Sequence, residues 1–317
     1  MNTFSDARFS EAEPSLDAVS SEYGLLDPRT MRAHNIHQVS LPAKLFRGAT
    51  SSLRLLPDFL VIGTQRGGTT SLYHYLKAHP DIELATTVDT HFFDKKYSKG
   101  LGWYRGHFPT TLEKYAAERL RKRPFVTGEA CSSYLFYPHT PARVAKVLPQ
   151  VKIIVFLRNP VDRAYSQYFH ARELGHEKLS FEESIQDELE RTAREREKIL
   201  RNENYYSNDY MQRSYLSRGI YLDQLQNWMK FFPREQFLLL KTEDYYSDPA
   251  STFKKVLTFL NVPEAEPQVR KKDFKEYKHN TYYTQMDSAL RERLGEYFKP
   301  HNAHLCEFLG MNFDWDK

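Results

Sequence analysis

Short apolar runs separated by longer amphipathic stretches recur between residues 58 and 260. The run at 151–157 is rich in β-branched residues, which is typical of a strand buried on both faces of a parallel sheet. The stretches between these runs have the periodicity of helices. Ser180 and Glu183 form a capping box at the start of one of them, a highly charged helix. Because strands alternate with helices, we expect an α/β fold with a parallel central sheet flanked by helices. The pattern predicts strands at 58–63, 125–128, 151–157 and 237–241, and helices at 69–78, 141–147, from 160, at 180–200, 219–232 and 249–260.

Residues 1–50 differ from the rest of the chain in their weak periodicity and many Ser, Asp and Glu residues. They predict an extended or partly helical N-terminal arm that is free to move. No internal repeat or low-complexity linker divides residues 51–317, so we expect these residues to form one domain.

A glycine-rich turn follows the first predicted strand and opens the first predicted helix. It reads Gly63-Thr64-Gln65-Arg66-Gly67-Gly68-Thr69-Thr70-Ser71. Backbone N–H groups and the positive end of the helix dipole converge at such a turn, which makes it a phosphate site. ATPase loops carry Lys before the first hydroxyl residue, whereas Thr69 stands at that position here and the cation, Arg66, precedes the glycine pair. The loop therefore predicts a P-loop-like three-layer fold that binds phosphate but is poorly suited to metal-assisted γ-phosphoryl transfer.

A second phosphate signal follows the strand at 151–157. Arg158 stands at the carboxyl end of this strand, where open α/β sheets bind their ligands. Asn159 and Pro160 suit the cap and first turn of the next helix, and Ser166 lies about two turns along it. Arg158 is therefore better placed for a phosphate contact than for a surface ion pair.

Taken together, these motifs resemble those of sulfotransferases that use PAPS (3′-phosphoadenosine 5′-phosphosulfate). The loop GTQRGGTTSL resembles their 5′-phosphosulfate loop, and FLRNPVDRAYSQY resembles their 3′-phosphate motif. The segment from Val88 to Asp94 and the C-terminal stretch from Asn280 also look like the family, so the resemblance covers roughly residues 55–317. It implies that PAPS is the co-substrate and that no metal is needed. The cofactor-binding residues it implies are Arg66, Gly67, Gly68, Thr69, Thr70, Ser71, Arg158, Ser166 and Tyr283.

The resemblance also indicates the catalytic residues. Arg66 occupies the position of the family's usual Lys, and it keeps the charge as a planar clamp rather than as a proton donor. Asp89 matches the family's Glu base but is one methylene shorter, and a displacement of ~1 Å can cost on the order of 10²-fold in rate. His91 is the alternative base, because an imidazole exchanges protons near neutral pH.

The resemblance implies that the acceptor is a hydroxyl of a glycan or of a small molecule, and the sequence leaves its identity open. Some glycan-sulfating members of the family use a Lys where this chain has Ala130, which weakens a heparan-type assignment. Two other functions are open: a small-molecule or nucleotide kinase on the same fold, and a non-catalytic nucleotide-binding protein. A kinase is expected to carry a lysine in the glycine-rich loop, which this chain lacks. Only the replacement of the family's Lys by Arg66 and of its Glu by Asp89 favours the non-catalytic protein.

The composition of the chain limits the classes of binding partner and the cellular compartment that we expect. A formal charge of +4 suits an anionic co-substrate but is too small to indicate nucleic acid. The two cysteines, Cys131 and Cys306, form no paired motif, so a reducing, cytoplasmic location is expected. No apolar stretch approaches the ~20 residues of a membrane span, and no basic-then-apolar signal pattern is seen at the start. The oligomeric state is left open.

Overall fold

The structure is a computed structural model that describes residues 40–186, 188–264 and 284–316. It divides the chain into two units, Met1–Gln38 and Val39–Lys317, and the second holds every element described below. Tyr283, predicted to bind the cofactor, lies outside the described residues.

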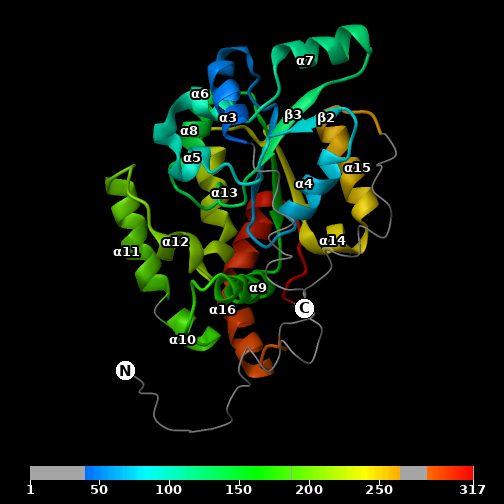
Figure 1. Cartoon of the computed structure of the whole chain (residues 1–317). Coiled ribbons are helices and arrows are strands. Elements are labelled where there is room, and N and C mark those ends of the chain that lie inside the picture. The colour runs from blue at the N-terminus through cyan, green and yellow to red at the C-terminus, as the bar shows by residue number, and fades with distance from the viewer. Residues whose placement is uncertain (1–39, 187, 265–283, 317) are drawn as a thin grey trace, which may run out of the picture. The chain divides into compact units, whose positions relative to one another are not determined.

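Five parallel strands form the central sheet in the order β2-β3-β1-β4-β5 (Figure 1). Phe59 of β1 is in register with Gly128 of β3 on one side and with Lys152 of β4 on the other. The chain continues from β1 to β2 on one side of the sheet and from β4 to β5 on the other. The carboxyl ends of β1 and β4 are therefore the switch point at which open α/β sheets bind their ligands. The strands are β1 (Phe59–Gly63), β2 (Ile82–Leu84), β3 (Val126–Ala130), β4 (Lys152–Leu157) and β5 (Phe237–Lys241).

Helices cover both faces of this sheet, because the central strands β1 and β4 carry apolar, buried side chains on both sides. One face packs on α4 and α15 through residues such as Leu76 and Val256, and the other packs on α8 and α13 through Val144 and Leu225. The helices are α3 (Leu41–Ala49), α4 (Thr69–Lys77), α5 (Phe92–Lys95), α6 (Gly100–Arg105), α7 (Thr111–Tyr115), α8 (Thr140–Val147), α9 (Pro160–Glu173), α10 (Phe181–Gln186), α11 (Glu188–Arg201), α12 (Asn208–Gln212), α13 (Tyr221–Met229), α14 (Thr242–Ser247), α15 (Pro249–Leu260) and α16 (Ser288–Leu309). The predicted α/β class and parallel sheet are confirmed.

The four predicted strands all occur as β1, β3, β4 and β5. The Asn159 side chain accepts from Val161 N and Asp162 N, so α9 is capped where predicted. The single helix predicted over 180–200 is described as α10 and α11 on either side of residue 187. Its capping box is present, since Ser180 N donates to Glu183 and Glu183 N to Ser180. β2 was not predicted because three residues carry too little periodicity to detect.

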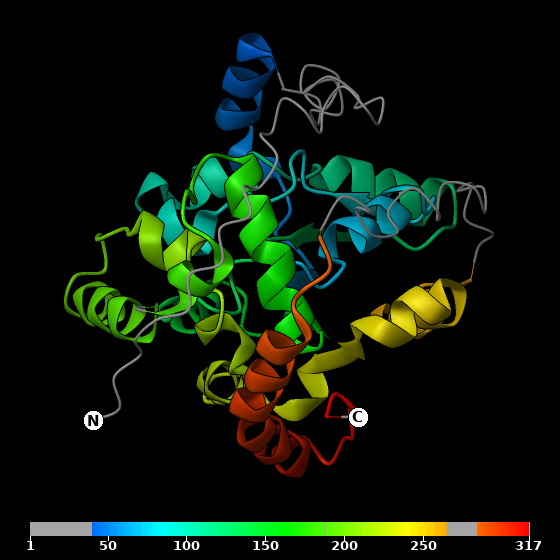
Figure 2. The same cartoon turned by 90° about the horizontal axis from the view of Figure 1, so that it is seen from below.

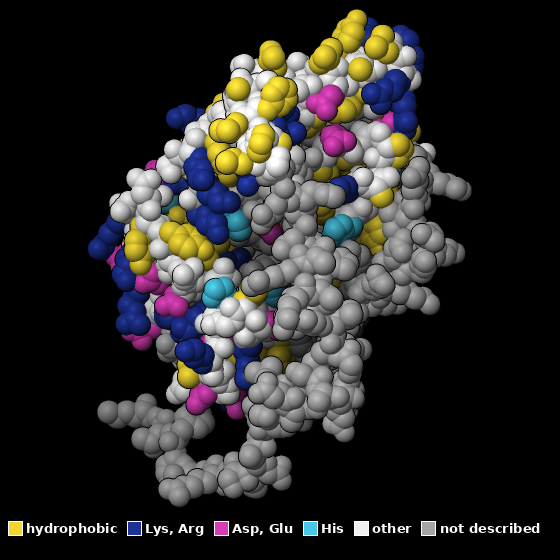
Figure 3. All heavy atoms as spheres, viewed as in Figure 1, with side chains coloured by type: hydrophobic (Ala, Val, Ile, Leu, Met, Phe, Trp, Pro, Cys, Tyr) yellow, Lys and Arg dark blue, Asp and Glu magenta, His cyan; other side chains and the backbone are white. Residues whose placement is uncertain are grey.

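Two further features are visible from the outside of this unit. Figure 2 shows α9 crossing the middle of the view with α16 beside it, in agreement with their contacts. Figure 3 shows apolar side chains gathered on the surface over α3 and α7, where Leu45 and Leu112 are 67% and 72% exposed. Within the described ranges, no helix combines the length and the apolar character needed to cross a membrane.

Candidate nucleotide and transfer site

The glycine-rich turn joins β1 to α4 at the carboxyl edge of the sheet. A Cβ on Gly67 would lie 2.9 Å from Thr64 O and 3.1 Å from the Phe156 Cβ, so only glycine fits there. Gly68 caps α4 with φ 106°, a conformation that residues with side chains rarely adopt. Thr69 and Ser71 are buried in the first turn of α4. The turn therefore presents backbone N–H groups at a helix start, as a phosphate site requires.

Arg66 joins the two predicted phosphate motifs. Its Nε donates to Ser166 Oγ over 2.9 Å, and Arg158 NH1 donates to the Arg66 carbonyl over 2.8 Å. Three of the predicted binding residues thus contact one another at the carboxyl ends of β1 and β4. A ligand with anionic groups at both ends would meet Arg66 and Arg158 together.

Residues from the C-terminal third of the chain hold both motifs in place. Thr242 Oγ1 donates to the Gly67 carbonyl over 2.8 Å, and the Ser71 and Tyr245 hydroxyls are 2.8 Å apart. Tyr221 OH donates to the Arg158 carbonyl over 2.7 Å. The sequence did not reveal these contacts, because nothing in a single sequence pairs residue 67 with residue 242. Ser71 engages Tyr245, so it is a structural part of the turn as well as a candidate phosphate ligand.

Asp89 and His91 lie on a loop that follows β2. Both adopt the left-handed backbone conformation, with φ values of 52° and 56°. This conformation costs roughly 1–2 kcal/mol for a residue with a side chain, and Asp and His are among the residues that adopt it most readily. Asp89 N donates to Ala130 O over 2.9 Å, and Asp89 Oδ1 accepts from Ser132 N over 3.0 Å. The loop is therefore anchored to the chain that leaves β3.

The His91 ring is oriented by a buried carboxylate. His91 Nδ1 lies 2.9 Å from Asp94 Oδ2, and the Ser133 hydroxyl donates to the same oxygen over 2.5 Å. Although burial opposes ionisation, hydrogen bonds from His91 and Ser133 hold the pKa of Asp94 below its ordinary value. An ionised Asp94 keeps the proton on Nδ1, so Nε2 of a neutral His91 is the nitrogen able to accept a proton.

His91, Asp94 and Cys131 place potential metal ligands within 4.8 Å of one another. Their hydrogen-bonding groups already satisfy one another, with Cys131 Sγ 3.7 Å from His91 Nδ1 and 3.3 Å from Ser133 Oγ. Burial also raises the pKa of the Cys131 thiol well above its ordinary value, so it is neither a ready ligand nor a ready nucleophile. We therefore assign this cluster to orientation of the His91 ring.

The two loops meet at the end of β1. Cys131 N donates to Val61 O, and Leu135 N donates to Ile62 O over 2.8 Å, so the segment 131–135 runs along the last residues of β1. That segment holds Asp89 through Ser132, and β1 leads directly into the loop that carries Arg66. The structure thus brings the transfer candidates and the phosphate candidates to one edge of the sheet.

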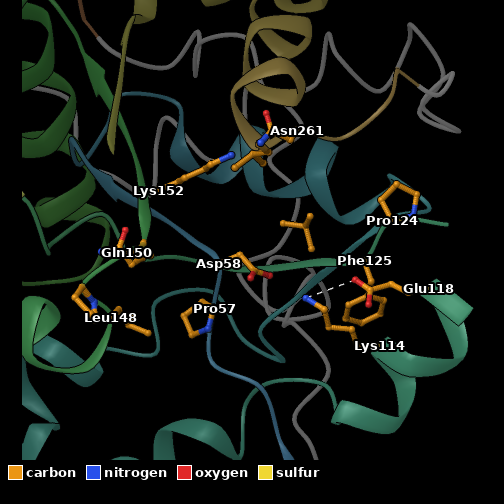
Figure 4. A pocket seen from close by; sticks show the side chains of 14 residues that line it. Pro57, Asp58, Lys114, Glu118, Pro124, Phe125, Leu148, Gln150, Lys152 and Asn261 are labelled. Carbon is orange, nitrogen blue, oxygen red and sulfur yellow. Dashed lines mark ion pairs between the residues drawn. The ribbon is translucent and has the colours of Figure 1, made fainter. Parts of the chain in front are cut away.

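A hollow of about 550 Å³ lies at the opposite edge (Figure 4). Asp58, which precedes β1, and Lys152, which begins β4, line it together with the Lys114–Glu118 ion pair of the α7 region. Lys152 Nζ donates to Phe259 O, and Asp58 Oδ2 accepts from Thr127 N. Asp58 and Lys152 are thus engaged in holding strand ends, and the hollow is separate from the loops described above.

Comparison with known proteins gives concordant matches. Residues 56–302 match the profile of one family, described as "Sulfotransferase domain". The chain is 29% identical over 293 residues to heparan sulfate glucosamine 3-O-sulfotransferase 3B1 of Homo sapiens, covering 86% of this chain and 68% of that protein. It is 30% identical over 281 residues to heparan sulfate glucosamine 3-O-sulfotransferase 3A1 of Mus musculus, covering 82% of this chain and 65% of that protein. The chain thus spans about two thirds of the length of these relatives.

A solved structure agrees with these matches. The sulfotransferase from Alicyclobacillus acidocaldarius superposes with a TM-score of 0.61 and 30% sequence identity. The superposition covers 83% of this chain and all of the other.

Proposed function

This chain belongs to the sulfotransferase domain family, and we propose that it transfers the sulfuryl group of PAPS to a hydroxyl of a saccharide. The observation that carries the proposal is the contact between its two phosphate motifs, Arg66 Nε to Ser166 Oγ and Arg158 NH1 to Arg66 O. PAPS has a phosphosulfate at the 5′ end and a phosphate at the 3′ end, and the two motifs would each hold one of them. The glycine turn supplies the backbone N–H groups, and Gly67 and Gly68 let it pack tightly against Thr64, Phe156 and Tyr245.

Arg66 would act as the electrostatic clamp of the reaction. Negative charge grows on the bridging oxygen of the phosphosulfate as its S–O bond breaks, so a cation beside that oxygen stabilises the transition state most. Ser166 orients the planar Arg66 guanidinium through its bond to Nε, beside the turn that would hold the phosphosulfate. Arg is a poor proton donor, so the leaving group departs as an anion under this proposal.

Asp89 or His91 would accept the proton of the attacking hydroxyl. The Asp89 carboxylate holds Ser132 N with one oxygen, and its second oxygen can bind the acceptor. The His91 ring has the tautomer that a base needs, because Asp94 engages Nδ1. Asp89 is our first assignment, since it stands at the position of the family's carboxylate base, and His91 is the alternative.

Similarity to two heparan sulfate 3-O-sulfotransferases supports a saccharide acceptor. Ala130 argues against a heavily sulfated one. It is 3% exposed at the end of β3, so this position offers no cation to an anionic sugar. We therefore favour a saccharide hydroxyl that carries little negative charge nearby.

The experiment supplies the native chain with PAPS and four acceptors: a neutral oligosaccharide, an N-sulfated heparosan oligosaccharide, a phenol and a long-chain alcohol. We expect mass spectrometry to find one sulfate on the neutral oligosaccharide and stoichiometric release of adenosine 3′,5′-bisphosphate. A double variant, Asp89→Asn with His91→Gln, is the control for non-enzymatic transfer. Transfer to the phenol or the alcohol alone would contradict the saccharide acceptor. Phosphoryl transfer from ATP with Mg²⁺, without any sulfuryl transfer, would contradict the whole proposal.

A further inference from the structure

Glu129 is a fully buried carboxyl group at the end of β3 that the transfer reaction does not use. It is 1% exposed, and three hydroxyl groups surround it. Its Oε1 accepts from the Thr90 hydroxyl and from Tyr134 OH over 2.9 Å, and its Oε2 accepts from Tyr104 OH over 2.6 Å. Within the described residues no Lys or Arg forms an ion pair with it. Such a group is retained in a core only where its hydrogen bonds have a purpose.

Two of these hydroxyl groups also hold the backbone just after His91. Phe92 N donates to Thr90 Oγ1 over 3.2 Å and to Tyr134 OH over 3.0 Å. Phe93 N donates to Tyr134 OH over 3.3 Å. A hydroxyl has one proton, so an oxygen that accepts these backbone N–H groups must direct its own O–H elsewhere. Glu129 Oε1 is the acceptor that receives both of those protons.

Tyr104 differs from the other two in one respect. Its hydroxyl donates to Glu129 Oε2, but none of its described contacts reaches the backbone of residues 89–93. Tyr104 and Tyr134 are both fully buried. Removal of either tyrosine hydroxyl therefore deletes one hydrogen bond to the same carboxyl group. Of the two removals, only that of the Tyr134 hydroxyl also deletes the bonds to the backbone of Phe92 and Phe93.

We propose that Glu129 is a positioning residue for sulfuryl transfer. Through Thr90 and Tyr134 it fixes the segment that presents Asp89 and His91. Both residues adopt a left-handed backbone conformation that persists only where the surroundings over-determine it. Thr90 lies between them, so its bond to Glu129 acts directly on the strained segment. The predicted effect on catalysis rests on the proposed function. The predicted effect on the loop rests on the hydrogen bonds alone.

The test compares Tyr134→Phe with Tyr104→Phe. We expect Tyr134→Phe to lower kcat at least about tenfold, the scale of a small misplacement of reacting groups, with the KM for PAPS nearly unchanged. Tyr104→Phe should leave kcat within about threefold of native while losing a similar amount of thermal stability. Thr90→Val removes the other loop-holding hydroxyl without a change of shape and should behave like Tyr134→Phe.

Two variants of the carboxyl group complete the set. Glu129→Gln keeps an acceptor at one position and can turn its amide toward Tyr104, so kcat should fall less than in Tyr134→Phe. Glu129→Met removes both acceptors and should lower kcat at least as far as Tyr134→Phe. If Glu129→Met does not fold, the comparison of the two tyrosines decides alone.

A second measurement does not depend on activity. Hydrogen exchange at the Phe92 and Phe93 amides should accelerate in Tyr134→Phe and stay at the native rate in Tyr104→Phe, whether or not an acceptor is found. Faster exchange without any sulfuryl transfer by the native chain would count against the proposed function and leave the loop-holding role standing. Equal kcat losses in the two tyrosine variants, or equal exchange rates, would overturn the positioning role.

Discussion

Arg66 Nε donates to Ser166 Oγ over 2.9 Å, and the two residues are 100 positions apart in the sequence. This bond ties the turn that follows β1 to the helix that follows β4. Each phosphate motif is therefore supported by the other. Removing a group from one motif should affect ligand binding at both.

Ser166→Ala is the first variant that tests this coupling. It deletes the partner of Arg66 Nε, so the affinity for adenosine 3′,5′-bisphosphate should fall about fivefold, equivalent to ~1 kcal/mol. Isothermal titration calorimetry measures the change. Ser184→Ala is the matched control, because Ser184 is also buried and its hydroxyl donates to Phe181 O instead. Equal losses in both variants would assign the effect to general destabilisation.

Arg158→Ala should distinguish the contributions that the two ends of the nucleotide make to its binding affinity. We expect adenosine 3′,5′-bisphosphate to bind about 1.5–3 kcal/mol more weakly, since a charged hydrogen bond to the 3′-phosphate is lost. Adenosine 5′-phosphosulfate lacks that phosphate and should lose less, through the lost bond from Arg158 to the Arg66 carbonyl alone. Competition binding with both ligands gives the difference. Identical losses would place Arg158 outside contact with the 3′-phosphate.

The base is tested by three substitutions. If Asp89 is the base, Asp89→Asn should lower turnover by ~10²–10⁴-fold with nucleotide binding retained. His91→Gln should then have a smaller effect. Asp89→Glu extends the carboxylate by one methylene while the residue keeps φ 52°, a value that Glu tolerates less well than Asp. Native-like turnover by Asp89→Asn would move the assignment to His91.

The nucleotide preference is checked by thermal shift. Adenosine 3′,5′-bisphosphate should stabilise the fold more than ATP with Mg²⁺, because the turn has Thr69 where an ATPase has lysine. Ligand at ~100 times its dissociation constant adds about 2.7 kcal/mol. The double variant Arg66→Ala with Arg158→Ala should lose this stabilisation. A larger shift with ATP and Mg²⁺ would favour a kinase.

The half-buried His107 and the fully buried Glu129 should make the free energy of unfolding depend on pH in opposite directions. Burial lowers the pKa of His107 to about 4, so the stability it contributes is complete above 6.5 and is lost as the pH falls toward 4. Burial raises the pKa of Glu129 to about 7, despite the bonds from its hydroxyl partners and with nearby Asp94 raising it further. The fold therefore binds a proton there that the unfolded chain has released, and Glu129 costs stability as the pH rises from 4.5 to 7.

Glu129→Gln removes one of these opposing contributions. Its free energy of unfolding relative to the native chain should therefore increase as the pH rises from 4.5 to 7. Urea unfolding at several pH values measures the difference. His107→Asn is the counterpart, and its stability relative to native should decrease over the range from 4 to 6.5. A difference between Glu129→Gln and native that does not change with pH would contradict the raised pKa of Glu129.

The parts of the fold and of the site that depend on neighbouring residues in the sequence are the parts that could be predicted from it. The strand and turn around Gly67 and the cap at Asn159 depend on neighbouring residues, and the structure has them where predicted. The bond from Arg66 to Ser166 and the support of Gly67 by Thr242 depend on strand order, which a single sequence does not encode locally. The hydroxyl groups around Glu129 were missed for the same reason, since Tyr104 precedes it by 25 residues.

The position of β1 in the sheet has a consequence for how the protein acquires its fold. Both neighbours of β1 are remote in sequence, so Phe59–Gly63 has no partner strand when it is first synthesised. Closing such long loops is slow, and an apolar strand that waits for its partners is prone to aggregate. The turn that carries Arg66 gains its bond from Arg158 only once β4 has docked. Refolding yield should therefore respond to changes in β1 in addition to final stability, which these buried residues also support.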